Sequence, residues 1–87
     1  MKLNDSRIRI LRAAQRGDLF HSIYGGYDWI NLEAPDGGRV AGAAQAALRA
    51  GHIELLPRQR GHEHRGQPYK LTDTGRAVLD AHDTNGK

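Results

Sequence analysis

Apolar positions along the chain follow two spacings, one typical of helices and one typical of strands. From Ser6 to Arg16, apolar side chains recur every three or four positions, after Asn4 or Asp5 as a cap and before Gly17. Side chains three and four apart share one face of a helix, and glycine commonly follows the last helical residue. The pattern therefore predicts a first helix over residues 6–16.

Residues 19–32 are rich in strand-forming side chains and are divided by Gly25-Gly26. A two-residue glycine link tolerates the positive φ angles of a tight turn, so we predict an antiparallel hairpin. The alternative is a short helix over residues 28–34, ended by the turn at 34–38.

A two-residue link at 25–26 sets the register of this hairpin. Ser22 then faces Trp29, and Phe20 faces Asn31. Successive side chains of a strand point to opposite faces, so one face is aromatic and the other is mostly aliphatic. The aromatic face consists of Phe20, Tyr24, Tyr27 and Trp29.

The alanine-rich run Arg39 to Ala50 predicts a second helix, and Gly51 follows it. The spacing places one apolar stripe on this helix, made of Val40, Ala44, Ala47 and Leu48. The opposite face holds Arg39, Gly42, Gln45, Ala46 and Arg49. Small residues would let this face enter a DNA groove, where glutamine can read adenine and arginine can read guanine or hold phosphate.

Two further strands are predicted at 52–56 and 67–71, with a polar, basic tip at 58–66 between them. The candidate inward positions are Ile53, Leu55, Tyr69 and Leu71. Thr72 is predicted to cap a last helix that runs to about His82. We expect one domain over residues 1–82 and a frayed tail over 83–87.

Size and composition exclude several classes of function. A chain of 87 residues has little room for a deep catalytic pocket. It has no cysteine, so thiol nucleophiles and zinc–thiolate sites are excluded. Catalytic spacings and phosphate-binding loops are missing from the sequence, and no run reaches the roughly 20 apolar residues of a membrane span. We expect a cytoplasmic protein that is not an enzyme, has no cofactor and does not bind membranes.

The net charge of +3 is unevenly distributed, because the basic residues occur in blocks. Residues 2–16 carry five Lys/Arg against one acid, and residues 39–70 carry six against two. Within the tip, Arg58, Arg60 and Arg65 could follow phosphates or enter a narrow minor groove. The alternative to DNA contact is an ordinary surface loop whose charged side chains only keep the protein soluble. His62 and His64 lack a third spaced ligand and are weak evidence for a metal site.

Two motifs in this order resemble the winged helix-turn-helix family. The first is Val40 to Leu55, which is similar to a recognition helix followed by "GxIxL". The second is Tyr69 to Leu79, which is similar to the second wing strand and the "LTxxGxxxL" helix. Together they cover about half of the chain. The sequence departs from the family at 19–32, where a standard member has a second helix.

The resemblance implies a small α+β domain that binds duplex DNA, as a transcriptional regulator of a bacterial or phage-like type or as an accessory DNA-binding factor. It implies that helix 39–50 lies in the major groove and that the wing, 58–66, lies on the backbone or minor groove. The residues expected to contact DNA are Arg39, Gln45, Arg49, Arg58, Arg60 and Arg65. The alternative is a protein-interaction module that uses the aromatic face of 20–29 for a homodimer or a protein partner. Exposed aromatic clusters often mark partner surfaces.

Overall fold

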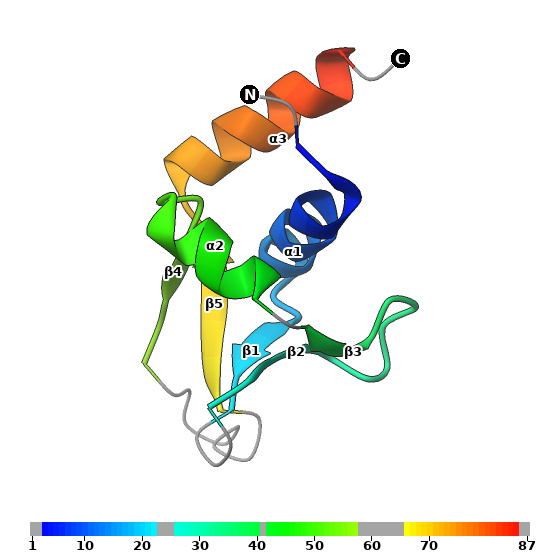
Figure 1. The fold of residues 1–87 in the computed structure, drawn as a ribbon, viewed down its shortest axis with the longest axis vertical. Coiled ribbons are helices and arrows are strands. Elements are labelled where there is room, and N and C mark those ends of the chain that lie inside the picture. Colours follow the sequence, from blue (N-terminus) through cyan, green and yellow to red (C-terminus); the bar gives the residue numbers. More distant parts are fainter. Residues whose placement is uncertain (1–2, 23–25, 41, 58–65, 86–87) are drawn as a thin grey trace.

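A computed structural model describes residues 3–22, 26–40, 42–57 and 66–85 of the chain (Figure 1). In this part the protein has three helices and one five-stranded antiparallel sheet, so the predicted α+β class is confirmed. The elements in chain order are α1 (Asp5–Arg16), β1 (Leu19–His21), β2 (Asp28–Ile30), β3 (Gly38–Val40), α2 (Ala43–Arg49), β4 (Ile53–Leu55), β5 (Gln67–Leu71) and α3 (Asp73–Asn85).

The strands are ordered β3-β2-β1-β5-β4, so the central strand β1 joins an N-terminal group of strands to a C-terminal hairpin. Phe20 of β1 pairs with Pro68 of β5, and His21 pairs with Gln67. The order differs from the predicted one because β3 adds a strand before α2. Strands β1, β2 and β3 therefore form an antiparallel meander before α2.

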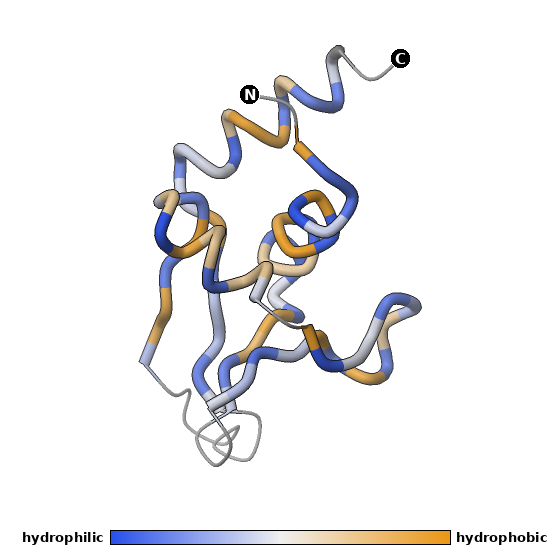
Figure 2. Tube along the Cα trace, viewed as in Figure 1, coloured by the Kyte–Doolittle hydropathy of each residue, from blue (hydrophilic) through white to orange (hydrophobic). Residues whose placement is uncertain are grey.

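Helix α1 supplies the centre of the hydrophobic core. Asn4 caps it by accepting a hydrogen bond from the Arg7 N–H at 2.8 Å, and the helix ends at Gly17, as predicted. Figure 2 shows hydrophobic and hydrophilic residues alternating along α1, as a helix with one buried face requires. The fully buried core residues, from α1 and the elements around it, include Ile10, Leu11, Leu19, Ile30, Ala44, Ala47, Ile53, Tyr69 and Leu79.

The predicted hairpin at 19–32 is confirmed, and the alternative helix over 28–34 is wrong. The register differs from the predicted one, because Phe20 pairs with Trp29 and Ser22 N–H donates to Tyr27 O at 2.8 Å. The link is therefore longer than two residues, and the pairing moves by two positions. A shift of two leaves every side chain on its predicted face, since strand side chains alternate with a period of two.

The predicted helix over 39–50 is too long at its N-terminal end. Arg39 and Val40 lie in β3, where they pair with Trp29 and Asp28 of β2. Helix α2 begins only at Ala43, because Gly42 has a φ of 79° and cannot lie inside a right-handed helix. Val40 is buried in both arrangements, so its apolar character did not distinguish a strand from a helix.

Strands β4 and β5 confirm the second predicted hairpin. Ile53 pairs with Leu71 and Leu55 pairs with Tyr69. Ile53 and Tyr69 are buried as predicted, whereas Leu55 is 38% exposed, so its predicted inward position is wrong. Leu55 is the last residue of β4 and lies nearer the open end of the hairpin than Ile53 does.

Helix α3 begins after Thr72, whose hydroxyl oxygen accepts a hydrogen bond from Gly75 N–H at 3.0 Å. The predicted cap is thus confirmed. The helix continues to Asn85, three residues beyond the predicted end at His82. Asp83 forms an ion pair with Arg12 of α1, which holds this last turn against the first helix.

Candidate nucleic-acid interface

Helix α2 is short and packs closely on α1. Ala44 and Ala47 are fully buried, and their small side chains allow the two helices to approach. Seven residues give a length of about 10 Å. Arg49 lies exposed in the last turn, where its charge also suits the negative end of the helix dipole.

Gln45 does not lie on the exposed face that the sequence predicted. Its side-chain nitrogen donates to Asp28 Oδ2 at 3.1 Å and lies 3.4 Å from the Tyr69 hydroxyl. It is half-buried between α2 and the sheet, because its amide completes a polar cluster there. The prediction that Arg39, Gln45 and Arg49 share one exposed helix face is therefore wrong.

This polar cluster centres on the carboxyl group of Asp28, which is 4% exposed. Asp28 Oδ1 accepts a hydrogen bond from the Tyr69 hydroxyl at 2.7 Å and lies 2.9 Å from His21 Nδ1. Burial first, and the neighbouring Asp28 carboxyl second, raise the pKa of the Tyr69 hydroxyl. The cluster fastens α2 to β1, β2 and β5, so it sets how α2 is presented.

Sequence reasoning missed the role of Asp28. The available signal was that His21 and Asp28 interrupt an otherwise aliphatic hairpin face. Two polar side chains on a buried face need partners, because an unpaired buried polar group costs about 1–3 kcal/mol. His21 and Asp28 contact each other, and Tyr69 and Gln45 from distant elements also donate to Asp28.

The second predicted contact surface, the basic tip, begins at the open end of the β4–β5 hairpin. Leu56 N–H donates to Pro68 O at 2.8 Å. Pro68 has no N–H to return this bond, and the Gln67 side-chain amide donates to Leu56 O at 3.4 Å instead. The hairpin is thus paired up to the base of the tip. Arg58, Arg60, Arg65 and the His62/His64 pair lie outside the described residues.

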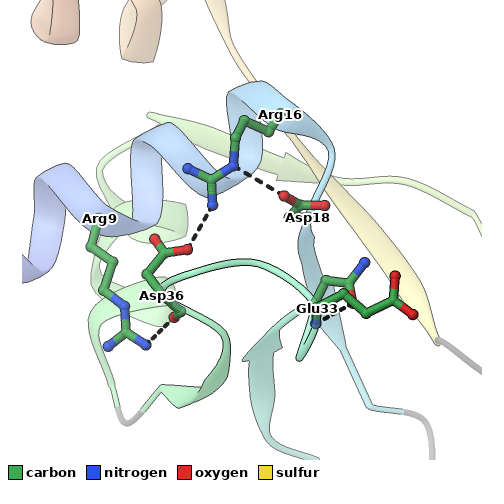
Figure 3. A network of polar contacts seen from close by, with 6 residues as sticks. Arg9, Arg16, Asp18, Glu33 and Asp36 are labelled. Carbon is green, nitrogen blue, oxygen red and sulfur yellow. Dashed lines mark hydrogen bonds and ion pairs between the residues drawn. The ribbon is translucent and has the colours of Figure 1, made fainter.

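Two arginines of α1 form ion pairs within the fold. Arg12 pairs with Asp83. Arg16 pairs with Asp18 and Asp36 at 3.0 and 2.8 Å (Figure 3). The charges of these two arginines are therefore compensated within the protein.

Arg7 of the same helix contacts His52, which follows α2. Arg7 NH1 donates to His52 Nδ1 at 3.0 Å, so this ring nitrogen carries no proton. Burial first, and the nearby Arg7 charge second, lower the pKa of His52 below 6.5. The unfolded chain then takes up the proton before the folded chain does as the pH falls.

A loss of stability at mildly acidic pH is the expected consequence. The stabilising effect of neutral His52 is complete above about pH 6.5 and decreases as the pH falls from there toward the lowered folded-state pKa. Urea unfolding at a series of pH values would measure it, with His52→Gln as the matched variant that cannot titrate. The stability difference between the two proteins should change below pH 6.5 in favour of the variant. A constant difference across this range would contradict the assignment.

The aromatic face of the hairpin is only partly exposed among the described residues. Phe20 is 6% exposed and stacks on Trp29 with ring centroids 5.0 Å apart. Tyr27 is 37% exposed, and the Arg39 guanidinium lies 4.3 Å above its ring. Tyr24 lies outside the described residues. In the described part the exposed area is reduced to Tyr27 and part of Trp29, and Arg39 covers some of it.

Arg39 and Arg49 differ from Arg12 and Arg16 of α1 in their partners. Among the described residues, neither has a carboxylate within ion-pair distance, although both are exposed. Arg39 lies just before α2 on the edge strand β3, and Arg49 lies at the other end of α2. Two uncompensated positive charges therefore flank this helix.

No protein-family model, curated protein or solved structure matches this chain. In the described ranges, no helix is long and apolar enough to cross a membrane. The same residues contain no group of three potential His, Cys, Asp or Glu metal ligands. Any function must therefore be argued from the arrangement of this chain's own residues.

Proposed function

We propose that this protein binds duplex DNA as a winged-helix variant and acts as a transcriptional regulator or accessory DNA-binding factor. Helix α2 would face the major groove, and the basic segment, the wing 58–66, would contact the backbone or minor groove. The observation that supports this proposal most is which arginines have a carboxylate partner and which do not. Arg12 and Arg16 of α1 form ion pairs within the fold, whereas Arg39 and Arg49 beside α2 have no carboxylate partner in the described residues.

The arrangement of α2 and the hairpin adds to this proposal. The helix leads directly into β4, and the hairpin that follows carries the basic segment at its open end. A groove-facing helix and a basic loop on neighbouring elements can contact one DNA molecule together. Because the outward residues of α2 are small, few of its side chains can reach DNA bases. We therefore expect contacts to the DNA backbone to contribute most of the affinity.

Fluorescence anisotropy on a labelled mixed-sequence duplex across a salt series tests the proposal. We expect binding in the micromolar range at low salt, and a slope of log affinity against log salt of roughly −4 to −5, as for four to six neutralised phosphates. Arg60→Ala/Arg65→Ala should weaken binding and make the slope shallower by about 2, because two phosphate contacts are lost.

A matched control separates the loss of a local DNA contact from the effect of a lower net charge. Arg76 is exposed on α3 and has no ion pair among the described residues. Arg76→Glu changes the net charge by the same two units as the double variant and should leave the slope unchanged. Absence of binding at low salt, or a slope near zero, would contradict the proposal. Either result would direct attention to Tyr27 and Trp29 as a surface for a protein partner.

A further inference from the structure

A row of aromatic and cationic side chains crosses strands β1, β2 and β3 on one face of the sheet. Phe20 pairs with Trp29 across β1 and β2, and Trp29 pairs with Arg39 across β2 and β3. Successive side chains of a strand point to opposite faces. The residues that point the other way belong to the core cluster with α1 and α2, and they include Leu19, Ile30 and Val40. The row therefore lies on the sheet face opposite these two helices.

The aromatic rings of this face are held by one another and by Arg39. Phe20 and Trp29 stack with their ring centroids 5.0 Å apart. Tyr27 lies two residues before Trp29, and therefore on the same face, and it is 37% exposed. The Arg39 Cζ atom lies 4.3 Å from the centroid of the Tyr27 ring. Tyr27 and Arg39 thus form an exposed stacked pair beside the partly exposed Trp29.

Arg39 brings a positive charge to this face that no described carboxylate compensates. Two other charged residues alternate onto the same face, Lys70 and Glu54, and they pair with each other at 3.1 Å. Stacking on an aromatic ring restricts the Arg39 guanidinium group without using its N–H groups. These donors therefore remain suited to an anionic ligand, and a phosphate group matches the guanidinium fork.

The exposed aromatic area in the described residues is small compared with a stable protein interface. Such interfaces bury about 800 Å² on each partner. A whole aromatic side chain buries roughly 150–250 Å², and only part of Tyr27 and Trp29 is exposed. In a two-fold dimer through this face, the same patch would meet its own copy and bring two Arg39 charges together. A nucleic-acid base requires less area, since it is a flat ring that stacks on aromatic side chains or on guanidinium planes.

We propose that Tyr27, Trp29 and Arg39 form a binding surface for single-stranded nucleic acid. Bases stack on the Tyr27–Arg39 pair and on Trp29, and the Arg39 N–H groups bind an adjoining phosphate. In a duplex the bases are stacked on one another, so this surface selects an unpaired strand. The inference goes beyond the proposed function and does not require it, because duplex contact through α2 would use the other side of the sheet.

The fluorescence of Trp29, the only tryptophan of the chain, tests this surface directly. The titrant is an oligothymidylate of about 10 nucleotides, within the roughly 4–16 nucleotides that single-strand-binding folds contact. We expect saturable quenching as bases stack on Trp29. Tyr27→Leu should weaken binding by roughly tenfold, because one base stack is lost, whereas Tyr27→Phe keeps the ring and should bind within about twofold of the wild type.

Separate controls address the charge and the bases. Arg39→Gln should make the slope of log affinity against log salt shallower by about 0.7, as for one phosphate contact on a single strand. Arg76→Gln removes the same charge from α3 and should behave as the wild type. A strand of the same length without bases keeps the phosphates, and it should bind more weakly and leave Trp29 fluorescence unchanged. Oligouridylate distinguishes RNA from DNA as the source of the strand, and quenching by either one supports the surface.

Three results would overturn the inference. The first is the absence of quenching by both strands at low salt. The second is wild-type binding by Tyr27→Leu, with urea unfolding to show that the variant is folded. The third is a concentration-dependent dimer that Tyr27→Leu dissociates, which would assign the face to a second copy of the chain.

Duplex binding is tested separately in the same samples. Excess duplex should not displace oligothymidylate, and Arg60→Ala/Arg65→Ala should weaken duplex binding while the quenching is retained. Quenching without any duplex binding would leave this inference intact and the proposed function wrong. Duplex binding without quenching would do the reverse.

Discussion

Gly66→Ala is expected to destabilise the protein by about 3 kcal/mol or more, because backbone strain and a steric clash add at this position. Gly66 has a φ of 85°, which costs an alanine about 1–2 kcal/mol. A Cβ at this position would also lie 2.2 Å from the main-chain oxygen of His21. That oxygen belongs to β1 and cannot move without disturbing the pairing of β1 with β5. Urea unfolding would measure the loss.

Gly42→Ala provides the matched control for this prediction. Gly42 has a similar φ of 79°, but a Cβ there meets no atom within 4 Å. Its cost should therefore be limited to the backbone term of about 1–2 kcal/mol. The difference between the two variants measures the close approach of the β5 start to β1. Equal losses would show that this approach has no energetic consequence.

Asp28→Ala is expected to cost about 3 kcal/mol, because it leaves three polar side chains without their common acceptor. Tyr69, His21 and Gln45 all contact the Asp28 carboxyl group, and each buried group left unpaired costs about 1–3 kcal/mol, less than additively. Part of a typical domain stability of about 5–15 kcal/mol would be lost. Hydrogen exchange of α2 amides should increase more than that of α3, since the cluster fastens α2 to the sheet.

Two further variants grade this effect. Asp28→Asn keeps an acceptor for the Tyr69 hydroxyl, and the Gln45 amide can turn to accept from the new N–H group, so the loss should be smaller. Tyr69→Phe removes one donor and leaves the other two contacts, and it should cost about 1 kcal/mol. If Asp28→Ala cost no more than Tyr69→Phe, the carboxyl group would not be the centre of the cluster.

Much of the element order could be predicted because local signals agreed with one another. Asn4 and Gly17 mark both ends of α1, and Thr72 marks the start of α3. Alternating side chains placed Ile53 and Tyr69 on the buried face of the second hairpin. In each case the pattern needed only residues close in sequence, and the structure confirms these positions.

Strand β3 could not be predicted in the same way. Three residues give no periodicity of their own, and the alanine-rich pattern of α2 extends backwards through Val40. What makes a strand of Arg39 and Val40 is pairing with β2, a contact that no local pattern contains. The two-residue error in the hairpin register has a related cause, because glycine pairs indicate a turn without fixing its length.

The candidate site depended most on contacts that are distant in sequence. Charge blocks drew attention to arginine, but they did not distinguish Arg16, which has two carboxylate partners, from Arg39, which has none among the described residues. Gln45 was placed by helical spacing alone, and the polar group that attracts it inward comes from β2. Whether a charge is available to a ligand is decided by tertiary structure.

The position of β1 at the centre of the sheet affects the order in which the protein can fold. Its partner on one side, β2, is close in sequence, whereas its partner on the other side, β5, is separated from it by more than half of the chain. Long-range pairing must overcome a larger loop-closure entropy and is slow compared with helix formation. A chain emerging from the ribosome therefore exposes one unpaired edge of β1 until residue 67 has been made. The sheet, and with it the stable base of the basic segment, is therefore completed late in folding.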